Sequence, residues 1–415
     1  MITRIQALNY RCLRHVDRRM GNFQMLVGPN ASGKTTFLDV VAFLGQLVSG
    51  GLEKAVGERT QNFQDLSWRR QGTGFELAIE AAIPEAVRTR LGQNPYDTVR
   101  YEVAVALDPQ TQEIGLTAER VLLKSAETNG ERQRDFFPQL VVAPPSILFP
   151  RTAKGTQTAI KKVPDGNDNY YAETAKGYNP SFKLGPRKSA LGNLPADETT
   201  FPVSTWLRQF LTEGVQSIVL NSLIIRKASP PGQERRFKPD GSNLPWVVEH
   251  LRTADEGRFR DWLRHVATAL PDLVDVRVVE REDDKHRYLV LVYTGGLEVP
   301  SWMASDGTLR LLALTLPAYL PDLQGMFLIE EPENGIHPKA VEAVYESLSS
   351  VYDAQILLAT HSPVMLSLVD PARVLCFAKD EHGATDIVPG SHHPALAEWH
   401  GEPNLNVLFA AGVLS

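Results

Sequence analysis

The spacing of apolar and polar positions predicts two strands and a helix at the start of the chain. Apolar residues alternate loosely at Ile2, Ile5 and Leu8, and an apolar-rich run covers residues 23–27. Alternation is typical of a strand with one buried face, whereas a short unbroken run indicates a strand buried on both faces. Residues 36–44 then repeat their apolar positions with helical spacing. We therefore expect the order strand, strand, helix over residues 1–45.

Later regions carry two further patterns. Residues 75–83 and 99–107 alternate cleanly and predict antiparallel strands of a second, β-rich layer, which residues 114–123 join. Residues 288–293 predict another strand. From residue 307 onward the pattern is helix, strand, helix, strand, helix, strand, which is typical of an α/β fold. The expected fold class is therefore α/β, with a mixed sheet that includes an antiparallel layer.

The middle of the chain has a different composition. Pro, Gly, Asn, Lys and Thr dominate residues 130–200, which indicates loop. Residues 203–223 and 243–270 carry helical spacing, and we expect them to be helices of an inserted lid. The expected domains are an N-terminal lobe, a loop-rich and helical insert, and a C-terminal lobe, at residues 1–125, 126–280 and 281–415.

Composition indicates a soluble protein of a reducing compartment. Hydrophobic residues make up 43% of the 415 positions, which is ordinary for a globular chain. The chain opens without a signal-peptide pattern, and no apolar run approaches the roughly 18 residues of a membrane span. Its only cysteines, Cys12 and Cys376, argue against a disulfide framework or a cysteine-based zinc site. We expect a cytoplasmic protein without a membrane partner.

Positive charge is concentrated in two segments, although the net charge is −6. Residues 151–190 hold eight Lys or Arg against three Asp or Glu, and residues 224–240 hold five against two. Solvated loops and a nucleic-acid surface both remain as interpretations of these runs.

Residues 28–35 read Gly-Pro-Asn-Ala-Ser-Gly-Lys-Thr and match the phosphate-binding pattern G-x-x-x-x-G-K-[ST] at every fixed position. A strand precedes the loop and a helix follows it, which is the context that the motif requires. In a phosphate-binding loop, backbone N–H groups and the positive end of the helix would bind phosphate. The alternative interpretation is a glycine-rich turn before an ordinary helix, without a ligand. The nucleotide contacts expected here are Gly28, Pro29, Asn30, Ala31, Ser32, Gly33, Lys34, Thr35 and Thr36.

Two other predicted strands end in groups that suit a magnesium–nucleotide site. The run 326–329 ends at Glu330 and Glu331, where one carboxylate can hold Mg²⁺ and the other can accept a proton from an attacking water. The run 355–360 ends at His361, whose neutral imidazole can contact a γ-phosphate. The alternatives are an acidic surface turn and a surface histidine.

A second loop that could bind an anion precedes a predicted helix. Ser305-Asp306-Gly307 lies directly before the apolar run 309–314, so Ser305 can cap that helix. One nucleotide does not need two such loops from one chain, whereas two chains facing each other do.

These elements resemble the ATP-binding-cassette-type ATPase head of the SMC/RecF class. More narrowly, they resemble stand-alone AAA family ATPases related to overcoming-lysogenization-defect and AbiEii-type phage-defence proteins. The likeness covers residues 1–125 and 285–415 and implies a P-loop NTPase with an inserted, largely helical lid. The matched elements in order are Walker A at 28–35, the signature turn at 305–307, Walker B at 330–332, a D-loop at 333–338 and a switch histidine at 361.

The resemblance implies ATP and Mg²⁺ as ligands and a role for each matched residue. Catalysis would rest on Glu331 as the base, His361 as the γ-phosphate switch and Lys34 as a phosphate contact. Thr35 and Glu330 would hold Mg²⁺. A long coiled coil or a Toprim nuclease often accompanies this class, but only 54 residues follow His361. We therefore expect any nuclease effector to be a separate chain.

The resemblance also implies at least a homodimer, because Ser305 and Gly307 would contact ATP on the opposite protomer. Two departures from transporter ATPases are the glutamate at position 330 in place of aspartate and a Ser-Asp-Gly signature in place of Ser-Gly-Gly. No motif places the glutamine that usually completes the Mg²⁺ shell; the candidates are Gln61, Gln64 and Gln71.

The leading hypothesis is an ATP-dependent dimeric switch in antiphage defence with a separately encoded effector. One alternative is a RecF-like DNA repair or recombination ATPase. Another is a nucleotide-dependent scaffold or sensor with little turnover, and a third is the ATPase subunit of a membrane transporter.

Overall fold

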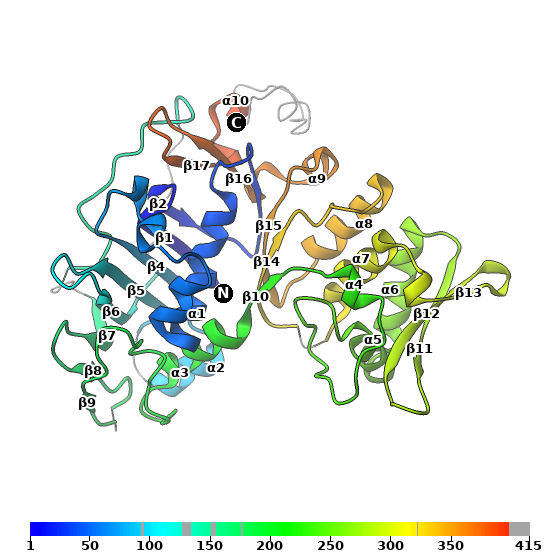
Figure 1. The fold of residues 1–415 in the computed structure, drawn as a ribbon, viewed down its shortest axis with the longest axis horizontal. Helices are drawn as coiled ribbons and strands as arrows, with labels where there is room; N and C mark the ends of the chain where they lie inside the picture. Colours follow the sequence, from blue (N-terminus) through cyan, green and yellow to red (C-terminus); the bar gives the residue numbers. More distant parts are fainter. Residues whose placement is uncertain (93–94, 127–133, 151–154, 176, 322, 398–415) are drawn as a thin grey trace.

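Three sheets organise the chain in the computed structural model, which describes residues 1–92, 95–126, 134–150, 155–175, 177–321 and 323–397. An eight-stranded antiparallel sheet occupies one side of the molecule, and a six-stranded sheet lies in the middle (Figure 1). A three-stranded sheet and most of the helices form the other side. The mixed α/β class predicted from the sequence is confirmed.

The antiparallel sheet has the strand order β2-β1-β4-β5-β6-β7-β8-β9. The strands predicted at 75–83, 99–107 and 114–123 are confirmed as β4, β5 and β6, which pair antiparallel in sequence order. The strand bounds are β1 Ile2–Tyr10, β2 Leu13–Arg19, β4 Gly74–Ala82, β5 Thr98–Leu107, β6 Ile114–Lys124, β7 Thr156–Lys162, β8 Asp168–Tyr170 and β9 Ser181–Phe182.

The central sheet has the order β10-β14-β15-β3-β16-β17, and all neighbours are parallel except β16 and β17. Its strands are β3 Phe23–Val27, β10 Val215–Ile218, β14 Gly325–Glu330, β15 Ala354–Ala359, β16 Val374–Lys379 and β17 Thr385–Pro389. Both faces are buried: Met326 and Leu328 of β14 pack in one core, and Phe327 and Ile329 pack in the other. This explains why these strands read as unbroken apolar runs.

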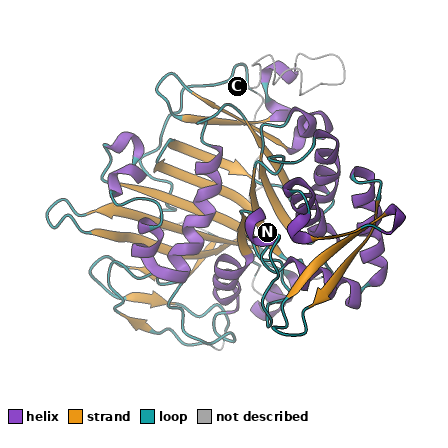
Figure 2. Cartoon of the chain, turned by 45° about the vertical axis from the view of Figure 1, so that its right-hand side comes forward, coloured by secondary structure: helices purple, strands orange, loops and turns teal. Residues whose placement is uncertain are grey.

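Helix α1 (Lys34–Gly57) contributes to the core that the central and antiparallel sheets share. Phe37, Val41 and Leu44 are fully buried in that core, together with residues of β1, β4 and β5. Figure 2 shows a long helix laid across the strands on the left of the molecule. Within the described part of the chain, α1 alone has the length and hydropathy of a membrane span, and 56% of its apolar window is buried inside the molecule.

The second core lies on the opposite face of the central sheet, beneath α5 to α8 and the three-stranded sheet β11-β12-β13. The predicted strand at 288–293 and the predicted helices at 243–270 are confirmed, as is the alternation from residue 307 onward. The bounds are α2 Glu85–Arg88, α3 Pro202–Gln209, α4 Ser222–Ile225, α5 Leu244–Ala254, α6 Glu256–Ala269, β11 Leu273–Glu280, β12 Arg287–Tyr293, β13 Glu298–Pro300, α7 Asp306–Thr315, α8 Pro338–Ser349, α9 Pro363–Leu368 and α10 Pro394–Ala397.

The segment expected as an insert, residues 126–280, is shared among the sheets. Its first part adds β7, β8 and β9 to the antiparallel sheet, although residues 130–200 were expected to be loop. The helical interpretation of residues 203–223 is wrong at Val215–Ile218, because β10 pairs there with β14 in register Val215 to Met326. Four residues are too few to show a period, so pairing with a distant strand decides their conformation. The predicted domain boundaries stay a prediction.

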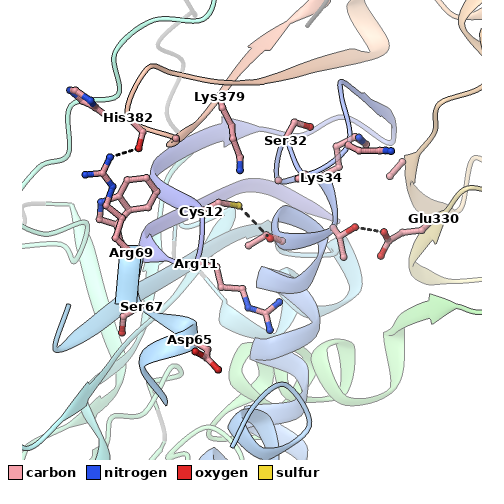
Figure 3. A pocket seen from close by; sticks show the side chains of 18 of the residues that line it. Arg11, Cys12, Ser32, Lys34, Asp65, Ser67, Arg69, Glu330, Lys379 and His382 are labelled. Atoms are coloured by element: carbon pink, nitrogen blue, oxygen red, sulfur yellow. Dashed lines mark hydrogen bonds between the residues drawn. The ribbon is translucent and has the colours of Figure 1, made fainter. Parts of the chain in front are cut away.

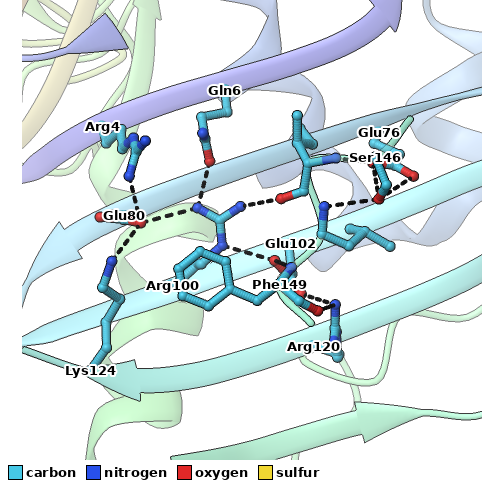
Figure 4. A network of polar contacts seen from close by, with 12 residues as sticks. Arg4, Gln6, Glu76, Glu80, Arg100, Glu102, Arg120, Lys124, Ser146 and Phe149 are labelled. Carbon is cyan, nitrogen blue, oxygen red and sulfur yellow. Dashed lines mark hydrogen bonds and ion pairs between the residues drawn. The ribbon is translucent and has the colours of Figure 1, made fainter. Parts of the chain in front are cut away.

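A buried ionic network lies against the antiparallel sheet (Figure 4). Arg100 is fully buried and donates to Glu102 at 2.8 Å and to Glu80 at 3.0 Å. It also donates to the carbonyl of Ile147 at 2.8 Å, and its guanidinium lies 4.5 Å from the ring centroid of Phe149. The segment 134–150 is therefore fastened across the sheet by charge-assisted hydrogen bonds.

Candidate nucleotide-binding site

The loop between β3 and α1 has the backbone of a phosphate-binding turn. Gly28 and Gly33 have φ angles of 150° and 107°, which side-chain-bearing residues rarely adopt. Packing demands glycine as well: a Cβ would lie 2.2 Å from the Phe377 carbonyl at position 28 and 2.3 Å from Thr385 Oγ1 at position 33. No side chain caps the N-terminus of α1, and Ser32 Oγ is buried without a partner among the described residues. The N–H groups at this helix N-terminus and the Ser32 hydroxyl are hydrogen-bond donors that fit a bound anion.

A cavity of about 660 Å³ opens beside this loop (Figure 3). The loop contributes residues 30–36 to its lining, and the ends of β14 and β15 contribute Glu330, Glu331 and His361. The predicted chemical groups therefore come from three neighbouring strands of one sheet and meet at the carboxyl edge of that sheet, where open α/β sheets bind ligands.

Lys34 folds back on its own loop. Its Nζ donates to the carbonyl of Gly28 at 2.8 Å and to that of Pro29 at 2.9 Å. Burial lowers the pKa of Lys34 to about 8, against the opposing influence of Glu331 and Glu330. A polyphosphate in the cavity would offer this ammonium stronger acceptors than two neutral carbonyls.

Thr35 and Glu330 offer hard oxygen ligands. The Thr35 hydroxyl donates to the Glu330 carboxylate, which joins the start of α1 to the end of β14. Among the described residues, no group of three His, Cys, Asp or Glu side chains could hold a metal ion. Two protein oxygens fit Mg²⁺, which keeps several waters and takes other ligands from substrate phosphates.

Glu331 has an unusual backbone conformation. Its φ is 45°, in the left-handed region that non-glycine residues seldom occupy. Its N–H donates to the Ala359 carbonyl at 2.8 Å, and its carboxylate accepts from the side-chain amide of Asn334. Strained backbone of this kind persists where the surrounding structure holds it, and such residues concentrate at active sites.

His361 follows β15 and lines the same cavity as Lys34 and Glu331. Burial lowers its pKa, the charge of Lys34 lowers it further, and Glu331 and Glu333 oppose both. The lowered pKa favours the neutral imidazole, which is the form that can accept a hydrogen bond.

The Ser305 loop lies elsewhere in the same chain. Ser305 caps α7 as expected, since its hydroxyl accepts from Thr308 N–H at 3.1 Å. Neither Ser305 nor Gly307 is among the residues that line the cavity. Gly307 instead lies against the D-loop, because a Cβ there would be 2.6 Å from the Gly335 carbonyl.

The far wall of the cavity contains residues that no motif predicted (Figure 3). Trp68 and Arg69 come from the short helix Trp68–Arg70, Lys379 is the last residue of β16, and His382 lies in the turn between β16 and β17. Thr385 closes the loop from behind by donating to the Ser32 carbonyl at 2.8 Å. In the sequence, this wall is indicated only by the Arg69-Arg70 pair that follows Trp68.

The glutamine candidates lie off the cavity lining. Gln61, Gln64 and Gln71 are not among its lining residues, although Gln71 lines a smaller neighbouring cavity of about 390 Å³. Tyr10 is fully buried and donates to Asp39 at 2.6 Å. It is a core residue, and its neighbour Arg11 lines the cavity.

Two characterised proteins match parts of the chain. One is the Old nuclease of Escherichia phage P2, 32% identical over 89 residues, which are 19% of this chain and 15% of that protein. The other is the zinc uptake system ATP-binding protein ZurA of Listeria innocua serovar 6a, 25% identical over 143 residues, which are 32% of this chain and 54% of that protein. The chain thus spans about half or less of the length of these relatives.

Two solved structures share the fold over nearly the whole chain. An SMC head bound to the C-terminal winged-helix domain of ScpA has a TM-score of 0.53 at 14% identity, covering 93% of this chain and 97% of that one. An Smc head with an extended coiled coil, bound to the C-terminal domain of ScpA derived from Pyrococcus furiosus, has a TM-score of 0.50 at 14% identity and covers 93% and 95%.

The family described as "AAA domain, putative AbiEii toxin, Type IV TA system" matches residues 23–367, which include every motif of the site. The chain therefore belongs to this family of P-loop ATPases, with the fold of an SMC head.

Proposed function

We propose that this protein binds ATP with Mg²⁺ and hydrolyses it, and that two copies close around two ATP molecules as a switch. The observation that carries the proposal is the convergence of Lys34, Glu330, Glu331 and His361 on one cavity beside an uncapped helix N-terminus. This arrangement combines phosphate binding, a Mg²⁺ ligand, a base and a γ-phosphate contact.

Each side chain has a separate task in the reaction. Lys34 and the N–H groups of the loop hold the phosphates, and Mg²⁺, bound through Thr35 and Glu330, would offset their charge. Glu331 accepts the proton of the attacking water. His361 is neutral and can hydrogen-bond to the γ-phosphate, so its position depends on whether that phosphate is present.

The place of the Ser305 loop supports the proposed dimer. Ser305 caps the N-terminus of α7, and its own chain does not bring this turn to the cavity. A second copy in face-to-face arrangement would bring Ser305 and Gly307 onto the ATP of its partner. Hydrolysis would remove the γ-phosphate from between the copies and reopen them.

The mass of the protein in solution, with and without ATP and Mg²⁺, tests this proposal. We expect the mass to double with nucleotide, and most strongly in Glu331→Gln, which should bind ATP but lose about 10²- to 10⁴-fold in turnover. Hydrolysis by Glu331→Gln at the parental rate would show that another group is the base.

A mass that never changes would contradict the switch in one of two ways. A constant monomer would leave the Ser305 loop without a nucleotide to bind. A constant oligomer would favour a scaffold in which ATP acts inside a preformed assembly.

We infer that the switch serves antiphage defence together with a separately encoded effector, such as a nuclease. The family description, which names a toxin, and the partial likeness to a phage nuclease support this inference. It predicts that the purified protein recruits that effector in an ATP-dependent way, and that Lys34→Ala abolishes recruitment.

DNA binding is a second candidate role, favoured by the exposed side chains of Lys227, Arg235 and Arg236 in the segment 224–240. If these residues contact phosphates, the affinity for duplex DNA should fall steeply as the salt concentration rises. The triple alanine variant should reduce the slope of log affinity against log salt by the amount expected for about three phosphate contacts. An affinity that the variant leaves unchanged would exclude this surface.

A further inference from the structure

Glu333 links the turn after β14 to the loop that carries His361. One carboxylate oxygen, Oε1, accepts from the Thr360 hydroxyl at 2.6 Å and from the His361 backbone N–H at 2.9 Å. Both donors belong to the segment that leaves β15 toward the cavity. A single oxygen of one side chain therefore anchors the histidine loop at two successive residues.

The anchor continues on the histidine side. Thr360 is fully buried, and its hydroxyl, while donating to Glu333, accepts from Ser362 N–H at 2.9 Å. Ser362 in turn caps α9 by accepting from Met365 N–H at 3.3 Å. The backbone on both sides of His361 is thus connected to Glu333 through hydrogen bonds. Loss of any of them would leave a buried polar group unpaired, which costs free energy.

The same turn carries the groups around the proposed base. Asn334 follows Glu333 directly, and its side-chain amide donates to the Glu331 carboxylate. The Gly335 carbonyl, one residue further, packs against Gly307 of the signature loop. The turn 331–336 therefore holds the proposed base and contacts both the histidine loop and the loop expected to face a partner.

The other oxygen of Glu333, Oε2, is buried and has no partner among the described residues. An unpaired buried carboxylate oxygen costs free energy. An apolar side chain would avoid this cost if packing alone were required. The carboxylate is therefore present for the acceptor that Oε1 supplies.

We propose that Glu333 is a positioning residue that sets His361 relative to Glu331. This inference rests on the proposed hydrolysis of ATP and deepens it. Glu333 is not among the residues that line the cavity; it acts through the backbone N–H of His361 and the hydroxyl of Thr360.

Steady-state ATP hydrolysis by Glu333→Ala, Glu333→Gln and the parent tests the proposal. Loss of the acceptor should lower kcat by up to about 100-fold, since a small displacement of a reacting group has effects of that size, while KM stays within about threefold. Glu333→Gln keeps a carbonyl oxygen and should retain most of kcat. Glu342→Ala, an exposed glutamate of α8, is the matched control and should behave as the parent.

A double-mutant cycle separates positioning from general destabilisation. If Glu333 acts through His361, then Glu333→Ala should have little further effect on kcat in a His361→Ala background. Full additivity of the two losses, or a single Glu333→Ala variant with parental kcat, would overturn the proposal. If Glu333→Ala does not fold, Glu333→Asp replaces it. Aspartate keeps the negative charge, but its shorter side chain moves the acceptor oxygen away from the Thr360 hydroxyl and the His361 N–H.

The failures of the two proposals are distinguishable. A parent chain without turnover overturns the proposed function and this role with it. A parent that hydrolyses ATP, and loses activity in Glu331→Gln but not in Glu333→Ala, overturns only the role of Glu333.

Discussion

Lys34 is the residue whose chemistry depends most directly on its surroundings. Burial of its ammonium lowers its pKa to about 8, although the ammonium donates hydrogen bonds to two backbone carbonyls. In the protein without nucleotide, the fraction of charged Lys34 therefore decreases as the pH rises through 8. A bound polyphosphate favours the charged form and raises the pKa again.

This shift predicts proton uptake when nucleotide binds. At pH 8.5 to 9 part of the Lys34 population is neutral, and binding of a non-hydrolysable ATP analogue should take up a fraction of a proton; at pH 6.5 Lys34 is already charged and should contribute none. Calorimetry in buffers of different ionisation enthalpy measures this uptake. Lys34→Arg is the control, because its guanidinium stays charged throughout. Equal uptake by the parent and this variant would contradict the prediction.

At the scale of elements, helix α1 serves two purposes. Its N-terminus lies at the proposed phosphate site, and its middle fills the core between two sheets. Close packing explains a glycine in the middle of this helix: a Cβ at Gly45 would lie 2.6 Å from the Leu211 carbonyl. The helix and the turn after α3 therefore approach each other backbone to backbone.

Gly45→Ala should destabilise the protein, although alanine is the better helix former. The clash with the Leu211 carbonyl should cost about 1–3 kcal/mol in the free energy of unfolding, as overpacked cores do. Gly57→Ala is the matched control on the same helix, because a Cβ there meets nothing within 4 Å; it should be neutral or gain up to about 1 kcal/mol. Chemical denaturation compares the two, and equal stabilities would show that the contact relaxes freely.

At the scale of the whole molecule, Gln355 of β15 connects the two large sheets. Its amide nitrogen donates at 2.8 Å to the carbonyls of Ile2 and Gly21, and its oxygen accepts from Ile2 N–H at 2.9 Å. Gln355 is fully buried. Residues 353 positions apart are thus joined by one side chain that satisfies three backbone groups.

Gln355→Leu should lower the free energy of unfolding by roughly 2–4 kcal/mol, because it leaves buried backbone groups unpaired. Gln324→Leu changes an exposed glutamine in the loop before β14 and should stay within about 0.5 kcal/mol of the parent. Urea denaturation followed by circular dichroism measures both. A small effect of Gln355→Leu would mean that water replaces the lost partners.

Much of the site was predictable because its residues belong to short patterns with a fixed local context. Lys34 follows a strand and opens a helix, and Glu331 and His361 each follow an apolar run. The structure brings all three to one cavity, while their roles stay predictions. The far wall, with Trp68 and His382, was not predictable, because these residues meet only when the β16–β17 turn packs over the phosphate loop.

The sequence by itself determined the elements whose periodicity is local: the phosphate loop between β3 and α1, the alternating strands β4 and β5, and the helix–strand order after residue 307. Only the tertiary structure decided that Val215–Ile218 is a strand and that Gly28 lies against the Phe377 carbonyl. The physical reason is that hydrogen bonds and packing between distant segments leave no regular spacing in either segment alone.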